Sequence, residues 1–155
     1  KTMFVVCGQD ETHPPQGIDQ LIAEANATIG HQSIVRFDFV SEDQLAALYQ
    51  QATAFFYLST YEGFGLPVLE ALACGTPTVT VQATAIPEVA GPAAIYADPD
   101  NVQGLVAIME RLARDHVWRE EKRQQSLLQA KKFSWSATAE STLLHIERLY
   151  KLRRT

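Results

Sequence analysis

The sequence has few cysteines, and it has no long apolar run. Its two cysteines, Cys7 and Cys74, lie in apolar surroundings without the CxxC spacing of a metal or redox site. We interpret both as reduced thiols of the core, and we expect no metal ion. No apolar stretch approaches the roughly 20 residues that a membrane-spanning helix needs, and the first residues lack the features of a signal peptide. The sequence therefore predicts a cytoplasmic protein.

Cations are scarce in the first 100 residues. This part holds only Lys1 and Arg36 against twelve acidic residues, whereas residues 101–155 hold eleven cations against six acidic residues. The later cations alternate with Glu and Gln in helical patterns and are not interleaved with aromatic residues. This arrangement favours a solvated helix surface over a nucleic-acid interface. No nucleic-acid partner is predicted.

The order of apolar runs and helical patterns predicts the fold class. The length of 155 residues and the 46% hydrophobic content suit one globular domain. Short apolar runs at 2–8, 33–40, 53–59 and 76–81 alternate with helical patterns at 18–29, 41–52 and 66–75. Strands that are apolar on both faces and separated by helices predict a Rossmann-like, doubly wound parallel sheet of the α/β class. A short strand at 93–97 and C-terminal helices complete the prediction.

The stretch STYEGFGLPVLEALACGTPTV, residues 59–79, is the strongest candidate for chemistry. Gly63 and Gly65 permit a sharp turn after a strand by tolerating positive φ, and Pro67 suits the first turn of the following helix. The amino end of a helix favours an anion such as a phosphate. Glu70 lies near the same end, and its carboxylate could accept two hydrogen bonds from a ribose diol. The spacing alone leaves two readings open, a ligand site and an ordinary turn before a core helix.

The stretch YEGFGLPVLEALACGTPTV resembles the donor-site signature of family four, or group 1, retaining glycosyltransferases of the GT-B fold. The hallmark of that signature is Glu, seven residues, Glu. The segments VRFDFVSEDQLAALYQQATAFFYLS, IPEVAGPAAIYADPD and FSWSATAEST resemble the parts of the family's C-terminal domain that flank the signature. The resemblance covers nearly the whole chain, and it implies the C-terminal, donor-binding half of a GT-B enzyme.

The resemblance implies a role for each matching residue. Glu70 would accept hydrogen bonds from the donor ribose, and Glu62 would lie beside the donor sugar, as an orienting group first and a catalytic group second. The backbone of Val40 would meet the nucleobase, and the Leu66 N–H would lie near a phosphate. The donor-binding set that the resemblance implies is Glu62, Gly63, Phe64, Gly65, Leu66 and Glu70.

The resemblance also implies partners. The donor would be a nucleotide sugar such as a GDP- or UDP-hexose, the acceptor a glycan or glycolipid, and no cofactor would be needed. Residues 1–155 would be a single, N-terminally truncated nucleotide-sugar-binding domain, without the N-terminal GT-B domain and without an earlier loop that carries an Arg and a Lys for the diphosphate. We therefore expect the chain alone to be inactive, and the full enzyme to be cytoplasmic with peripheral membrane association as an option. A GT-B sugar-nucleotide epimerase and a non-catalytic nucleotide-binding module stay open as alternatives.

Overall fold

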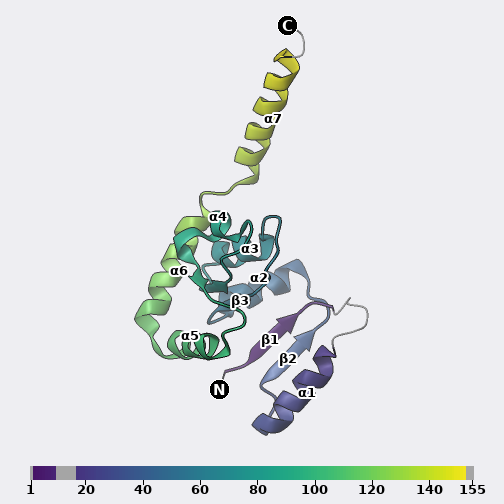
Figure 1. Ribbon diagram of the computed structural model, residues 1–155, viewed down its shortest axis with the longest axis vertical. Helices are drawn as coiled ribbons and strands as arrows, with labels where there is room; N and C mark the ends of the chain where they lie inside the picture. Colours follow the sequence, from purple (N-terminus) through teal and green to yellow (C-terminus); the bar gives the residue numbers. More distant parts are fainter. Residues whose placement is uncertain (1, 10–16, 153–155) are drawn as a thin grey trace. The chain divides into compact units, whose positions relative to one another are not determined.

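The computed structural model describes residues 2–9 and 17–152 (Figure 1). The chain divides into two compact units, residues 1–45 and residues 46–155. Each unit has its own parallel strands, and each is described by itself below. The candidate glutamates Glu62 and Glu70 both belong to the second unit.

The first unit is a strand, a helix and a second strand. Strand β1 (Phe4–Cys7) and strand β2 (Ile34–Phe37) pair in parallel, with Phe4 opposite Ile34, and helix α1 (Ile18–Ile29) connects them. The side chain of Asn26 in α1 donates to the Ile34 carbonyl and accepts from the Ser33 and Ile34 N–H groups, at 2.8–2.9 Å. These bonds hold the carboxyl end of α1 against the start of β2.

Helix α2 (Glu42–Gln51) begins with a capping box. The Ser41 hydroxyl accepts from the Gln44 N–H at 3.3 Å, and the Gln44 side chain accepts from the Ser41 N–H at 2.9 Å. This reciprocal pair satisfies two N–H groups that would otherwise lack partners at the helix start. The helix predicted from the pattern at 41–52 is confirmed.

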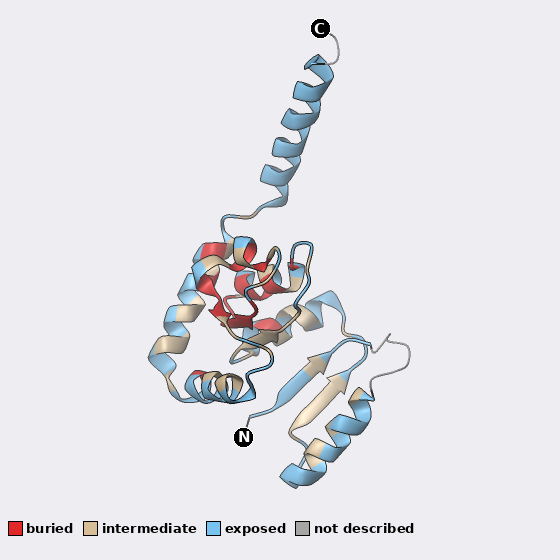
Figure 2. Cartoon of the chain, in the orientation of Figure 1, coloured by how far each residue is buried: buried red, intermediate tan, exposed pale blue. Residues whose placement is uncertain are grey.

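The second unit has a three-stranded parallel sheet in the order β3-β4-β5. Its strands are β3 (Phe55–Tyr57), β4 (Thr78–Thr80) and β5 (Ile95–Tyr96), and helix α3 (Leu66–Ala73) connects the first two. The short helix α4 (Ile86–Ala90) and the 3-10 turn η1 (Gly91–Ala93) lead from β4 to β5. Buried residues gather on these elements (Figure 2), and one core cluster consists of Val68, Leu72, Ile86, Ala90, Ala93 and Ala94.

Three fully buried threonines lie in and just before the central strand. Each hydroxyl has a backbone partner: Thr76 donates to the Tyr49 carbonyl at 2.6 Å, Thr78 to the Thr76 carbonyl at 3.0 Å, and Thr80 to the Tyr57 carbonyl at 2.8 Å. A buried hydroxyl without a partner would oppose folding. Two of these bonds also fix the backbone of Tyr49 and Tyr57, which contact the candidate glutamates.

Three helices complete the second unit: α5 (Val102–Arg114), α6 (His116–Ala130) and α7 (Trp135–Leu152). Side chains of Asn101, Asp115 and Ser134 accept from backbone N–H groups at the three helix starts. Helix α6 packs on α3. Gln129 of α6 is buried and donates to the Val89 carbonyl at 2.8 Å. Every described residue of α7 is exposed (Figure 2).

The structure confirms the α/β class, with parallel strands in each unit, and it corrects one detail. Both cysteines are free thiols, as predicted, but Cys7 is exposed and Cys74 is half-buried, so the prediction that both lie in the core is wrong. No helix in the described ranges is long and apolar enough to cross a membrane.

Candidate active site

The turn between β3 and α3 depends on Gly65. This residue has φ 90° and ψ 50°, in the left-handed region, and it precedes the first residue of α3. A Cβ atom added to Gly65 would lie 2.5 Å from Cδ1 of the fully buried Ile86. An L side chain is strained at this φ, and its Cβ atom would have to displace the end of the Ile86 side chain, so glycine is favoured here. Gly63 differs, because its φ is not positive and an added Cβ atom would meet no atom within 4 Å. The prediction of positive φ is therefore confirmed for Gly65 and wrong for Gly63.

The amino end of α3 has no side-chain cap among the described residues. The N–H groups of Val68 and Leu69 both donate to the Gly65 carbonyl, at 3.0 and 3.2 Å. Pro67 stands in the first turn, as predicted, and has no N–H. The Leu66 N–H, as the first of the helix, has no partner within the helix. The helix dipole adds partial positive charge at this end, so an anion would be stabilised there.

Glu62 lies in the loop before this helix, and its carboxylate is held by a tyrosine. The Tyr57 hydroxyl donates to Oε1 of Glu62 at 2.6 Å, a short bond of the charge-assisted kind. The bond from Tyr57, followed by one from Ser59, lowers the pKa of Glu62. Burial, and then the bond and negative charge of Glu62, raise the pKa of Tyr57 to about 12. At neutral pH Glu62 is therefore ionised and Tyr57 is protonated.

The backbone of Glu62 is held from the neighbouring strand. Its N–H donates to the Thr84 hydroxyl at 3.0 Å, and Thr84 lies in the loop after β4. Loops that follow neighbouring parallel strands emerge at the same edge of a sheet, which explains how residues 22 positions apart meet. The carboxyl-end edge of β3 and β4 therefore fixes both the backbone and the side chain of Glu62.

Glu70 occupies the second turn of α3 and is exposed. Its Oε2 accepts from the hydroxyl of the buried Tyr49 at 3.3 Å. A carboxylate has about four lone-pair sites, so this one bond leaves capacity for hydroxyl groups of a ligand. The geometry is compatible with the predicted diol-binding role.

Aromatic rings connect the supports of the two glutamates. The rings of Tyr49 and Phe55 meet edge to face with centroids 5.0 Å apart, and those of Phe55 and Tyr57 stack at 5.9 Å. In the turn itself, Phe64 is partly exposed and contacts Phe133 edge to face at 6.0 Å. Aromatic pairs of this kind add stability beyond burial alone. Phe64 therefore anchors the turn to the segment after α6.

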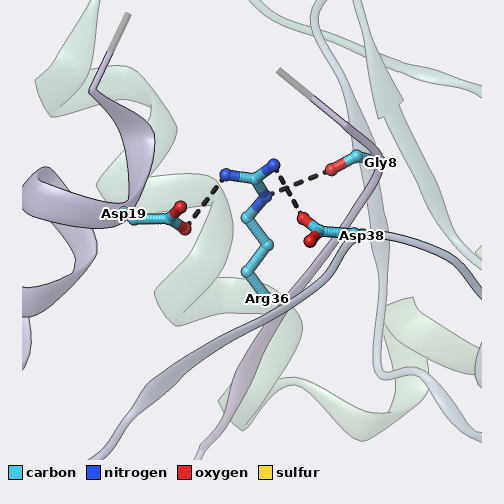
Figure 3. Close-up of polar contacts among 4 residues, drawn as sticks. All are labelled: Gly8, Asp19, Arg36 and Asp38. Atoms are coloured by element: carbon cyan, nitrogen blue, oxygen red, sulfur yellow. Dashed lines mark hydrogen bonds and ion pairs between the residues drawn. The ribbon is translucent and has the colours of Figure 1, made fainter. Parts of the chain in front are cut away.

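Arg36, a candidate cation for a diphosphate, is already paired within the first unit. Its guanidinium contacts Asp19 at 3.0 Å and Asp38 at 2.8 Å, and its Nε donates to the Gly8 carbonyl at 3.1 Å (Figure 3). The Arg36 side chain is only 11% exposed. The contacts of Arg36 therefore stabilise the first unit. Val40, the predicted nucleobase contact, also belongs to the first unit, and its role stays a prediction.

Tyr49, Tyr57 and Thr84 are site residues that the sequence analysis missed. Tyr49 lies in the helical pattern at 41–52, Tyr57 lies in the apolar run at 53–59, and Thr84 follows the apolar run at 76–81. A hydroxyl at the carboxyl end of a predicted strand, as in Tyr57, was the available signal. In the described ranges, no cluster of His, Cys, Asp and Glu side chains could hold a metal ion.

The comparisons with known proteins decide the family. The family described as "Glycosyl transferases group 1" matches residues 1–133. The chain belongs to the group 1 glycosyl transferases. The match covers both glutamates, the turn between them, and the tyrosines and threonine that contact them.

Curated relatives of this group 1 glycosyl transferase chain include mannosyltransferases. The chain is 43% identical over 105 residues to the O-antigen chain mannosyltransferase B of Escherichia coli. The matched segment covers 68% of this chain and 28% of that protein. The chain is 34% identical over 126 residues to the serotype-specific mannosyltransferase WbdA of Escherichia coli. Here the matched segment covers 81% of this chain and 16% of that protein. The chain thus spans less than a third of the length of these relatives.

Solved structures of low sequence identity share the fold of this group 1 glycosyl transferase chain. The structure of the sucrose-phosphate synthase of Thermosynechococcus elongatus matches 96% of this chain, and the match covers 38% of the synthase chain. Its TM-score is 0.82 at 22% sequence identity. The structure of Anabaena Alr3699/HepE in complex with UDP and glucose matches 94% of this chain and 40% of the HepE chain. Its TM-score is 0.77 at 18% sequence identity. The fold is therefore that of the Rossmann-like C-terminal half of a GT-B glycosyltransferase, as predicted.

Proposed function

We propose that this chain is the donor-binding part of a retaining mannosyltransferase, which transfers a mannosyl unit from a nucleotide diphosphate donor to a glycan or glycolipid acceptor. One observation carries the proposal: Glu62 and Glu70 lie on either side of the uncapped amino end of α3, and each carboxylate is held by a tyrosine hydroxyl. Two carboxylates beside an anion-binding helix end match a ligand that combines hydroxyl groups with phosphates.

In this proposal each end of the donor meets a different part of the site. Glu70 accepts hydrogen bonds from the ribose hydroxyls, and the Leu66 N–H and the α3 dipole meet a phosphate. Glu62 and the backbone of the Gly63–Gly65 turn meet hydroxyls of the donor sugar. Positive charge develops at the anomeric carbon as the bond to the diphosphate breaks. The Glu62 carboxylate can stabilise this charge as well as orient the sugar.

The rest of the enzyme completes the proposed site. Arg36 is the one cation in the described part of residues 1–100, and it is paired with two aspartates. We therefore propose that cations for the diphosphate come from residues outside this chain. An N-terminal GT-B domain would supply the acceptor site. The proposal includes transfer without a metal ion, at the cytoplasmic face of a membrane. The O-antigen relatives support a glycan or glycolipid acceptor.

The comparisons favour transfer over the two alternatives. The matching family consists of glycosyl transferases, and the curated relatives named above are mannosyltransferases. An epimerase would convert a nucleotide sugar without an acceptor, and a binding module would not change it.

Product analysis of the full-length enzyme tests this function. GDP-mannose and UDP-glucose are each supplied with and without a lipid-linked glycan from the same cells, and the products are identified by NMR. We expect an acceptor-dependent product with the anomeric configuration of the donor. An inverted linkage would contradict the retaining mechanism. A new free nucleotide sugar, formed without acceptor, would identify an epimerase and overturn the transferase proposal.

A further inference from the structure

Thr84 has a backbone conformation that its residue type disfavours. With φ 47° it is the one non-glycine residue with positive φ among residues 2–9 and 17–152. A β-branched residue is rare in this region because its side chain crowds the backbone. Strain of this kind persists where the surrounding structure holds it, and it concentrates at functional sites. A glycine at this position would relieve the strain, but it would have no hydroxyl.

The Thr84 hydroxyl contacts Glu62, the candidate sugar-binding residue. Its Oγ1 accepts from the Glu62 N–H at 3.0 Å. The turn that carries Thr84 is closed by a bond from the Ile86 N–H to the Ala83 carbonyl at 3.2 Å. The side chain of Ile86 in turn lies against Gly65. The loop after β4, through Thr84, and the start of α4, through Ile86, therefore contact the loop after β3 on either side of Gly63 and Phe64.

The Glu62 side chain has a separate support. The Tyr57 hydroxyl donates to its Oε1 at 2.6 Å. Tyr57 is itself fixed, because its carbonyl accepts from the buried Thr80 hydroxyl at 2.8 Å and its ring stacks on Phe55 at 5.9 Å. Glu62 is thus held at its backbone by Thr84 in the loop after β4 and at its carboxylate by Tyr57 of β3.

We infer that Thr84 and Tyr57 are positioning residues for Glu62: the Thr84 hydroxyl fixes where its backbone lies, and the Tyr57 hydroxyl fixes where its carboxylate points. This inference rests on the proposed function, because it takes Glu62 as the group that meets the donor sugar. A side chain that is already held in position loses less conformational freedom when the transition state forms. Removing the residues that hold it should therefore lower kcat more than it raises KM.

The first test compares two substitutions at Thr84 in the full-length enzyme. The assay measures release of nucleoside diphosphate from GDP-mannose with water as acceptor, in which water replaces the diphosphate at the anomeric carbon. Thr84→Ala removes the hydroxyl, and we expect kcat to fall about two- to tenfold, as for one lost hydrogen bond. Thr84→Ser keeps the hydroxyl and should restore kcat. Equal kcat values for the two variants would overturn the role of Thr84.

A double-mutant cycle separates positioning from general damage to the fold. In a Glu62→Gln background the carboxylate is gone, so Thr84→Ala should change kcat less than about twofold further. A full additional loss would show that Thr84 acts independently of Glu62 and would overturn the inference. If Glu62→Gln itself leaves transfer and donor affinity unchanged, the proposed role of Glu62 is wrong. This result can be told apart from one in which Glu62 matters but the Thr84 substitutions have no effect.

A readout without turnover tests Tyr57. NMR of the labelled Glu62 carboxyl carbon follows its titration in the 155-residue chain. Tyr57→Phe removes the hydroxyl that holds the pKa of Glu62 down, so this pKa should rise. Tyr96→Phe is the matched control, because Tyr96 packs against the same core cluster as Tyr57 and its hydroxyl donates to the Gly91 carbonyl at 2.9 Å, away from Glu62. An unchanged Glu62 pKa in Tyr57→Phe, or an equal rise in both variants, would overturn the role of Tyr57.

Discussion

At the scale of single residues, Gly65 connects the turn to the core. Its left-handed conformation and its contact with Ile86 disfavour any side chain. We predict that Gly65→Ala lowers the free energy of unfolding of the 155-residue chain by about 1–3 kcal/mol, through backbone strain and overpacking. Urea denaturation measures this change. Gly63→Ala is the control and should be nearly neutral, because its added Cβ atom meets no neighbour. Equal losses for the two variants would contradict the account of the turn.

Residue roles could be predicted from the sequence only where a local pattern determines them. Pro67 and Gly65 are fixed by the helix start that follows, and the sequence indicated both. The bond from Tyr57 to Glu62 depends on how a strand end and a loop face each other, and the bond from Thr84 to Glu62 depends on which strands are neighbours. Such contacts between separate elements leave no spacing signal, so the sequence analysis missed them.

At the scale of elements, α6 begins with an ionised cap. The Asp115 carboxylate accepts from the Trp118 N–H at 2.9 Å, and this bond first, then the nearby Arg111, lowers the pKa of Asp115 below its ordinary value of 3.8. We predict that Asp115→Ala lowers Tm at neutral pH, whereas Asp115→Asn, which keeps a capping oxygen, lowers it less.

The pH dependence of this cap has a definite sign. A lowered pKa in the folded state means that the stabilisation is present above pH 3.8 and is lost as the pH falls through the lower, folded-state value. The difference in Tm between the natural chain and Asp115→Ala should therefore shrink on acidification below that point. Calorimetric scans across this range measure it. A difference that stays constant would contradict an ionic contribution from the cap.

The sequence predicted the order of helices and strands well, because apolar periodicity and caps are local. Helix α1 has the predicted bounds, and α2 lies within the helical pattern predicted at 41–52. The exposure of elements was predicted less well. The stripe of Leu143, Ile146 and Tyr150 on α7 reads as a packing face, yet it is exposed in the described chain. An apolar periodicity shows that a face exists and does not show what covers it.

At the scale of the whole molecule, the charge distribution sets an expectation for the chain alone. Arg36 is paired with Asp19 and Asp38, and the other cations of the described part follow residue 100. We predict that the 155-residue chain shows no sugar transfer from GDP-mannose or UDP-glucose to a glycan acceptor, because two phosphates need more compensating charge than one helix end provides. Radiolabel transfer assays measure this. Measurable sugar transfer by the 155-residue chain would contradict it.

Donor affinity of the full-length enzyme tests the central claim, that Glu70 binds the donor ribose, most directly. Calorimetric titration of GDP and UDP is compared for the natural enzyme, Glu70→Ala and the control Glu110→Ala, which changes an exposed glutamate on α5. Loss of a charge-assisted hydrogen bond costs about 1.5–3 kcal/mol. The account predicts that Glu70→Ala weakens the binding of the preferred nucleotide about 10- to 150-fold and that Glu110→Ala leaves it unchanged. Unchanged affinity in Glu70→Ala would contradict the account.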